Sequence, residues 1–262
     1  MSPDDPGSQE DIRDRRSRSF GQVANDYDRY RPGYPDQLYE DVLALHLGGR
    51  VLEAGAGTGI ATAELGRRGA SVVAVEHDPE MAAVARSRTT GLNVEVVVSR
   101  FEDYAPAPGS FALVVAAQAW HWIDPVTGPE VAHQALGPDG SLCIWWNRPR
   151  EFSGPIWEAI QRAYQTHAPA LDRQAAMQSR NYGAPRPDHY PGFGSWVLRR
   201  YEWDQEFDAD SYVGFLGTHS DHVLLPADAR NALLGDIHGA IVHGGGRLTY
   251  AWRTLLYVAC KS

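Results

Sequence analysis

One short stretch, residues 51–60, constrains the fold of this chain more than any other. It reads VLEAGAGTGI, so an apolar run leads into three glycines at alternate positions and then into a helical pattern. Glycine adopts positive φ without a steric penalty and lets the backbone approach a ligand closely. The N-terminus of the helix that follows presents free N–H groups. The stretch therefore predicts a strand, a tight glycine turn and a helix, with a ligand site at the turn.

Further apolar runs follow along the chain, with helical stretches between them. The first five predicted strands are residues 50–54, 72–76, 94–98, 111–116 and 141–146. Each run is nearly continuous in apolar side chains, as in parallel strands that are buried on both faces. The alternation of strands with helices, such as residues 60–68 and 79–88, predicts an α/β fold with a doubly wound, mostly parallel sheet.

The segments on either side predict additions to this sheet. Residues 1–19 are polar and charged and predict a disordered tail, whereas residues 20–47 predict two short helices separated by a turn. From about residue 147 to 194 the strand–helix rhythm breaks, which predicts a helical cap inserted between the fifth and sixth strands. This cap is expected to contain helices at residues 155–166 and 172–179.

The C-terminal part predicts the last two strands of a seven-stranded sheet, at residues 196–207 and 248–261. Helices are expected between them, at residues 210–218 and 227–243. Residues 20–262 are therefore expected to form a single domain.

The spacing of the glycines distinguishes two kinds of nucleotide site. The dinucleotide fingerprint needs its third glycine three residues after the second, and here that position is Ile60, with the glycine one residue earlier, at Gly59. The first strand also ends in an acid, Glu53. Its carboxylate would repel a pyrophosphate but suits an ammonium or sulfonium group. Both features disfavour a nicotinamide-dependent oxidoreductase, which stays open as an alternative.

With Glu53, Gly55, Gly57 and Gly59, the stretch resembles motif I of class I S-adenosylmethionine-dependent methyltransferases. The resemblance implies a Rossmann-like fold, S-adenosylmethionine as the cofactor, and methyl transfer by in-line displacement as the activity. It also implies a role for Glu76, which ends the second strand. In the family the acid at this place accepts hydrogen bonds from both ribose hydroxyls.

The resemblance implies further contacts with the cofactor. Met81 stands at the spacing where the family often packs an apolar side chain on the adenine, although a place in the helix core is equally open. Residues 99–104 resemble the family's loop after the third strand. In the family this loop contacts the edge of the adenine through a polar side chain and a backbone N–H. Arg100 stands where Asp or Ser is common, so the backbone of Phe101 is preferred over the Arg100 side chain as the adenine contact. The other candidate cofactor contacts are His77, Gln118, Tyr27 and Arg31.

Residues 116–124, AAQAWHWID, resemble a subgroup of small-molecule enzymes similar to the trans-aconitate methyltransferases. That subgroup also has an N-terminal helix like residues 20–32, which implies a lid over the cofactor. The resemblance therefore predicts a small-molecule acceptor near this loop. His121 is the candidate general base, with a structural histidine as its alternative. The candidate acceptor contacts are Trp120, Trp122, Tyr30 and Trp146. Trp120 and Trp122 could instead be core aromatic residues, and Tyr30 could instead pack the N-terminal helix onto the domain.

Composition narrows the possible partners. The net charge is −9 and there is no basic run, which disfavours nucleic acid. The N-terminus lacks a signal-peptide pattern, no apolar run would span a membrane, and no Cys/His spacing indicates a metal site. Cys143 and Cys260 lie in apolar runs and predict reduced core residues and a cytoplasmic location. Two further alternatives are a protein that binds the cofactor without transferring its methyl group and an enzyme that uses the same cofactor for other chemistry. The oligomeric state is not indicated.

Overall fold

The computed structural model describes residues 28–45, 48–150, 152–171 and 190–262. The predicted tail, Tyr27 and the predicted helix at 172–179 lie outside these residues. Within them, Pro35 precedes a helix, as predicted, and residues 28–30 form a short helical turn ahead of it.

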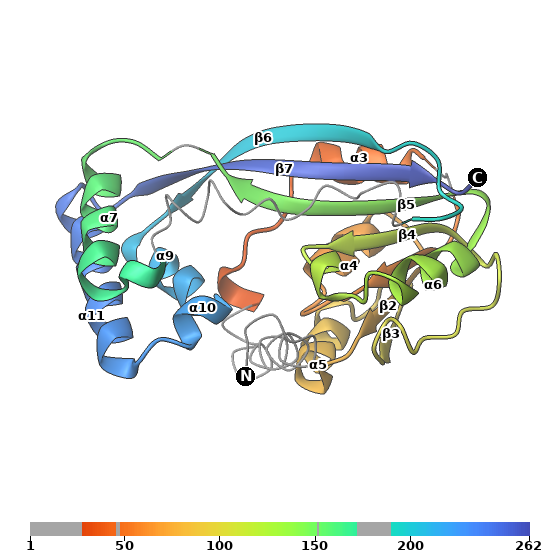
Figure 1. Ribbon diagram of the computed structural model, residues 1–262, viewed down its shortest axis with the longest axis horizontal. Coiled ribbons are helices and arrows are strands. Elements are labelled where there is room, and N and C mark those ends of the chain that lie inside the picture. Colours follow the sequence, from red (N-terminus) through yellow and green to blue (C-terminus); the bar gives the residue numbers. More distant parts are fainter. Residues whose placement is uncertain (1–27, 46–47, 151, 172–189) are drawn as a thin grey trace.

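Seven strands form one sheet in the order β3-β2-β1-β4-β5-β7-β6 (Figure 1). They are β1 (Val51–Ala54), β2 (Val72–Glu76), β3 (Val94–Val98), β4 (Phe111–Ala117), β5 (Leu136–Pro149), β6 (Val197–Phe207) and β7 (Leu248–Cys260). The first five strands are parallel, and β7 runs antiparallel to both of its neighbours. This confirms the predicted α/β class with a doubly wound, mostly parallel sheet of seven strands.

Helices cover both faces of the parallel part of the sheet. On one face, α3 (Asp36–Leu43) and α4 (Ile60–Arg67) pack on apolar side chains of β1, β2, β4 and β5. On the other, α6 (Thr127–Ala135) and the turn η2 (Trp120–Trp122) complete a second core layer. The helix α5 (Pro79–Arg88) packs beside β2 and β3. Because side chains alternate along a strand, Glu53 lies on the same face as Val51, under α3 and α4.

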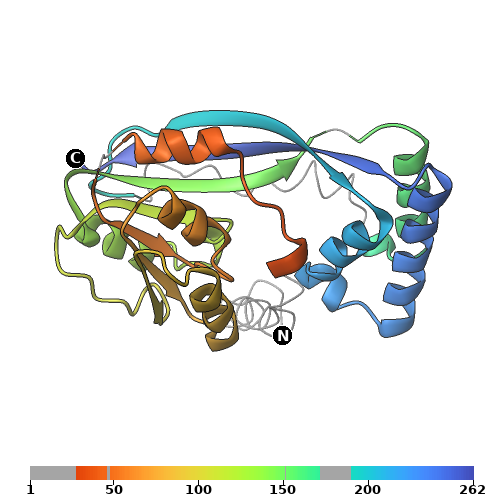
Figure 2. The same cartoon turned by 180° about the vertical axis from the view of Figure 1, so that it is seen from behind.

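A second group of helices sits at the far ends of β5, β6 and β7 (Figures 1 and 2). We call this group the helical lobe, and it comprises α7 (Pro155–His167), α9 (Ala209–Gly217), α10 (Ser220–Val223) and α11 (Ala227–His243), next to the short turn η3 (Pro169–Leu171). They share one apolar core, which includes Tyr164, Tyr212, Phe215 and Ile237. The helix α7, predicted as part of an inserted cap, therefore packs with the helices that connect β6 to β7.

Two details differ from the sequence-based expectation. The fifth strand is longer than predicted, because Asn147, Arg148 and Pro149 continue its pairing with β7. Neither the two polar side chains nor the proline ends the strand. At its other end, Leu136 pairs with Phe111 before a register shift, although the following GPDG residues are typical of a turn. The expectation that both cysteines are buried is wrong for Cys260, which is exposed at the end of β7, whereas Cys143 is buried.

Candidate functional site

The glycine turn after β1 has the backbone that its sequence predicts. Gly55, Gly57 and Gly59 have φ of 69°, 58° and 79°. A Cβ atom on Gly55 would lie 2.6 Å from Cβ of Ala119, and one on Gly59 would lie 3.1 Å from the Cα of Ala85. A Cβ on Gly57 would meet nothing within 4 Å. Gly55 and Gly59 therefore allow close packing, and Gly57 borders open space that a ligand can occupy.

Glu76, at the end of β2, ties the glycine turn to the second strand. Its Oε2 accepts a hydrogen bond from the Gly57 N–H at 2.7 Å, and its Oε1 accepts one from the Asp78 N–H at 2.9 Å. The Nδ1 atom of His77 lies 2.9 Å from the same Oε1. This hydrogen bond raises the pKa of His77 and favours its protonated form.

An ionised carboxylate accepts about four hydrogen bonds. Glu76 therefore has room for one ribose hydroxyl beside its three present donors. A second hydroxyl needs His77, whose side chain is 37% exposed, to turn away.

Glu53 is the buried acid of the site, with no solvent exposure. Its Oε2 accepts a hydrogen bond from the Thr62 hydroxyl at 2.6 Å, whereas its Oε1 has no partner in the described part of the chain. Burial, with a smaller contribution from the charge of Glu76, raises the pKa of Glu53 to about 7, although the Thr62 hydrogen bond lowers it. An unpaired buried carboxylate oxygen is costly. A ligand carrying a positive or hydrogen-donating group would remove that cost.

The loop after β4 lies directly against the glycine turn, through the contact between Ala119 and Gly55. It starts at Gln118, whose φ of 57° is unusual for a residue other than glycine. The Gln118 N–H still donates to the carbonyl oxygen of Trp145 at 2.9 Å and so continues the pairing of β4 with β5, and the positive φ then turns the chain away from the sheet. Strained backbone of this kind is often found at functional sites. The bend carries the turn η2 towards the carboxyl edge of the sheet.

The aromatic residues of this loop have different environments. Trp120 is buried, donates its indole N–H to the Tyr190 hydroxyl at 2.8 Å and packs against the ring of Phe101. Its side chain is therefore part of the core, which is the alternative considered for it. Trp122 is half-buried, so of the tryptophans in this loop it presents the larger surface.

His121 accepts a hydrogen bond at Nδ1 from the Trp146 indole N–H, at 3.2 Å. An indole nitrogen can only donate, so a neutral His121 in this arrangement carries its proton on Nε2. In that tautomer neither ring nitrogen can accept a proton while the bond to Trp146 is kept. This hydrogen bond favours the structural alternative for His121 over the base, and it occupies the polar atom of Trp146, which is 3% exposed.

Residues 28–35, which we call the bridging segment, connect the two groups of helices. Asp28 pairs with Arg88 of α5, while Arg31 donates from Nε and Nη2 to the hydroxyl and carbonyl oxygens of Thr218, both at 2.9 Å. The Tyr30 ring lies against Gly214 of α9, where a Cβ atom would come within 2.6 Å of it. Tyr30 and Arg31 are therefore engaged with the helical lobe.

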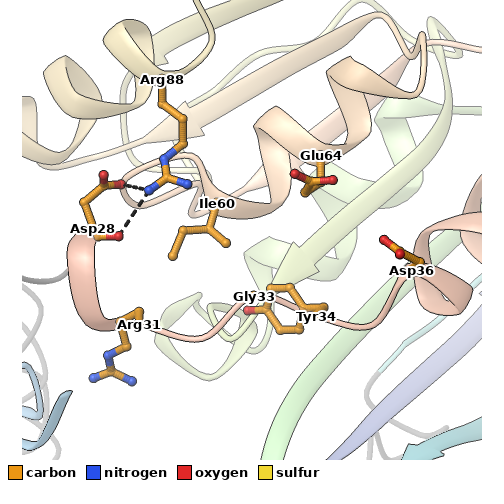
Figure 3. Close-up of a pocket in the computed structure, with 8 residues that line it drawn as sticks. All are labelled: Asp28, Arg31, Gly33, Tyr34, Asp36, Ile60, Glu64 and Arg88. Carbon is orange, nitrogen blue, oxygen red and sulfur yellow. Dashed lines mark hydrogen bonds and ion pairs between the residues drawn. The ribbon is translucent and has the colours of Figure 1, made fainter. Parts of the chain in front are cut away.

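A cavity of about 330 Å³ lies under the bridging segment. Figure 3 shows Asp28 and Arg88 facing each other beside Ile60, with Arg31 pointing away from them. The lining residues are Asp28, Arg31, Gly33, Tyr34, Asp36, Ile60, Glu64 and Arg88. Of these residues, only Arg31 is a site residue predicted from the sequence. The others come from three separate segments of the chain, and no local motif marks them.

The remaining candidates lie at the rim or in the core. Met81 is buried on α5, which supports its core alternative. Arg100 is half-exposed, with Nε 3.9 Å from Oε2 of Glu102. Glu102 in turn accepts the Asp124 N–H at 2.6 Å and so joins the loops after β3 and β4. No group of three or more potential metal-binding side chains occurs in the ranges that the structure describes.

Comparison with known proteins agrees with this geometry. A family model described as a methyltransferase domain matches residues 51–140. An uncharacterised methyltransferase of Mycobacterium tuberculosis is 30% identical over 237 residues, which cover 88% of this chain and 90% of that protein. A methyltransferase-like protein of Dictyostelium discoideum is 32% identical over 129 residues, 48% of each chain.

Solved structures with the same fold are more distant in sequence. A protein of Anaeromyxobacter dehalogenans, assigned by name to the type II methyltransferases, superposes with a TM-score of 0.64 at 19% identity over 88% of this chain and 97% of its own. The phosphoethanolamine N-methyltransferase 2 of Haemonchus contortus, solved with phosphomonomethylethanolamine and S-adenosylhomocysteine, has a TM-score of 0.50 at 15% identity. That match covers 94% of this chain and 60% of the other.

The sheet order, the glycine turn and the acids that end β1 and β2 define a class I S-adenosylmethionine-dependent methyltransferase. With a relative 30% identical along most of both chains, this chain belongs to the methyltransferase family. It is an enzyme, and its cofactor is S-adenosylmethionine. No helix within the described ranges is long and apolar enough to cross a membrane.

Proposed function

We propose that this enzyme transfers the methyl group of S-adenosylmethionine to a small molecule that binds beside the loop after β4. The observation that carries the proposal is the contact between Ala119 and Gly55, because it puts the loop with Gln118, His121 and Trp122 directly on the glycine turn. Open α/β sheets bind ligands outside the carboxyl ends of their strands, and both segments begin there.

The cofactor is proposed to lie along the glycine turn. The open space at Gly57 admits it, Glu76 accepts from its ribose, and the buried, unpaired carboxylate oxygen of Glu53 favours a ligand that carries positive charge. The remaining residues around the cofactor would be Gly55, Gly59, His77 and Gln118. When bound, the cofactor supplies an electrophilic methyl group, so the chain needs no nucleophile of its own.

The role of the protein is then to hold the acceptor in line and to exclude water. We assign this positioning role to Trp122 and to the Nε2–H of His121, whose ring Trp146 orients. A flat or apolar acceptor with a hydrogen-bond acceptor atom would suit these two side chains. The net charge of −9 argues against nucleic acid as the substrate. The finer resemblance to the trans-aconitate methyltransferases stays a prediction.

We also propose that residues 20–262 act as one domain and that the bridging segment forms the lid over the cofactor. In support, Asp28 of the segment pairs with Arg88 of α5, and Arg31 binds Thr218 of the helical lobe. Four residues of the segment also line the cavity in Figure 3.

A labelling experiment tests the small-molecule acceptor. The enzyme receives S-adenosylmethionine with a labelled methyl group, together with either a filtered metabolite extract, total RNA or an unfolded protein mixture. We expect label to accumulate in a product that passes an ultrafiltration membrane, only in the metabolite reaction and only with the intact glycine turn. Label retained on RNA or protein instead would contradict the proposal.

A further inference from the structure

Asn147, at the carboxyl end of β5, joins three parts of the site that are far apart in the chain. Its side-chain Nδ2 donates to the carbonyl oxygen of Gly33 in the bridging segment at 2.9 Å. Its Oδ1 accepts the hydroxyl of Thr254 on β7 at 2.7 Å. Its main-chain oxygen accepts from Nε2 of Gln118, in the loop after β4, at 3.4 Å. Asn147 is 4% exposed, so these bonds form away from solvent.

The neighbouring residue Trp145 attaches the same two segments. The Tyr34 ring packs edge-on against the Trp145 ring, with their centroids 5.8 Å apart, and the Gln118 N–H donates to the Trp145 carbonyl oxygen. The bridging segment and the loop after β4 are therefore both anchored on Trp145 and Asn147. Since Gly33 and Tyr34 line the cavity, the position of this anchor sets one wall of it.

The side of Asn147 that faces β7 is fixed independently. Thr254 is fully buried, and its hydroxyl accepts the indole N–H of Trp203 on β6 at 2.9 Å while it donates to Asn147. With Oδ1 held by Thr254, the planar amide group turns its Nδ2 towards the carbonyl oxygen of Gly33. The sheet thus orients Asn147, and Asn147 orients the bridging segment.

We propose that Asn147 is a positioning residue that couples the bridging segment to the loop after β4. The segment settles over a bound cofactor at the same time as Gln118 takes its place beside that cofactor, because both segments are held by one residue. The proposal rests on the proposed function for its consequence in cofactor binding, whereas the coupling itself is a property of the free protein.

The test replaces Asn147 by aspartate. The Asn147→Asp variant keeps the acceptor for Thr254 but, at pH 8, brings a carboxylate against the Gly33 carbonyl oxygen in place of a donor. We expect the dissociation constant for S-adenosylhomocysteine, measured by calorimetry, to rise about tenfold. We also expect faster amide exchange in residues 33–43 and 117–122 of the ligand-free protein.

The matched control is Gln205→Leu. This variant removes the side chain on β6 that accepts the indole N–H of Trp252 on β7, so it also breaks a side-chain hydrogen bond between strands, but it leaves Thr254 and Gly33, the side-chain partners of Asn147, unchanged. Its affinity is expected to stay within about twofold of the wild type, with unchanged exchange in both segments. Unchanged exchange in Asn147→Asp, or an equal effect in Gln205→Leu, would overturn the coupling.

If wild-type protein does not bind S-adenosylhomocysteine, the cofactor assignment fails instead. The exchange of the ligand-free variants then still decides for or against the coupling.

Discussion

Replacement of Gly57 by valine is expected to abolish binding of S-adenosylmethionine and S-adenosylhomocysteine in a chain that still folds. The residue has φ of 58°, and a Cβ atom added to it meets no protein atom within 4 Å, so the new side chain extends into the volume assigned to the cofactor. A left-handed conformation costs a non-glycine residue about 1–2 kcal/mol, which a domain of ordinary stability survives. Calorimetry should detect no saturable binding.

Gly69→Val is the matched control. Gly69 also has positive φ, 86°, and open space at its Cβ position, but it lies between α4 and β2, at the other end of β2 from Glu76. The two variants therefore carry the same kind of backbone strain, and only one faces the site. Equal loss of cofactor binding in both variants, or retained binding in Gly57→Val, would refute the role of the glycine turn.

Replacement of Glu53 by glutamine is expected to stabilise the ligand-free protein at alkaline pH relative to the wild type. Burial raises the pKa of Glu53 from 4.5 to about 7. Between these values the unfolded chain has lost the proton while the folded chain keeps it, so wild-type stability falls as pH rises through this window. The shift corresponds to about 3 kcal/mol, all of it lost above pH 7. The neutral amide of glutamine has no such dependence.

Urea unfolding of both proteins at pH 5 and pH 8 measures this difference. The gain of Glu53→Gln over the wild type should grow by about 2.5 kcal/mol between the two pH values, since part of the loss has already occurred at pH 5 and all other titrating groups are common to both. Glu80→Gln, which changes an exposed carboxyl on α5, should show no comparable growth. A gain for Glu53→Gln that does not change with pH would contradict the raised pKa of Glu53.

The parallel part of the fold could be predicted because its signals are local. Each of β1, β2 and β4 is a short apolar run whose side chains are almost all buried, and the glycines after β1 need the positive φ that only glycine adopts freely. The extension of β5 beyond Trp146 could not be predicted in this way. Its polar residues are held by pairing with β7, more than a hundred residues later in the chain.

The same difference between local signals and tertiary contacts applies to the residues of the site. Glu53 and Glu76 could be predicted because each ends a strand next to the glycine turn. The environments of Trp120 and His121 could not, since they depend on Tyr190 and Trp146, whose positions follow from the tertiary fold. Asn147 carries no signal in its neighbourhood of the sequence, because all three of its partners come from other segments.

Calorimetric titration of the wild-type protein with S-adenosylhomocysteine, S-adenosylmethionine and NAD, in parallel, tests the central claim most directly. The buried acid at the end of β1 and the glycine spacing predict micromolar binding of the two sulfur compounds, or about −8 kcal/mol. NAD is expected to give no saturable heat, because Glu53 disfavours a pyrophosphate. Saturable binding of NAD without a response to either sulfur compound would contradict the account.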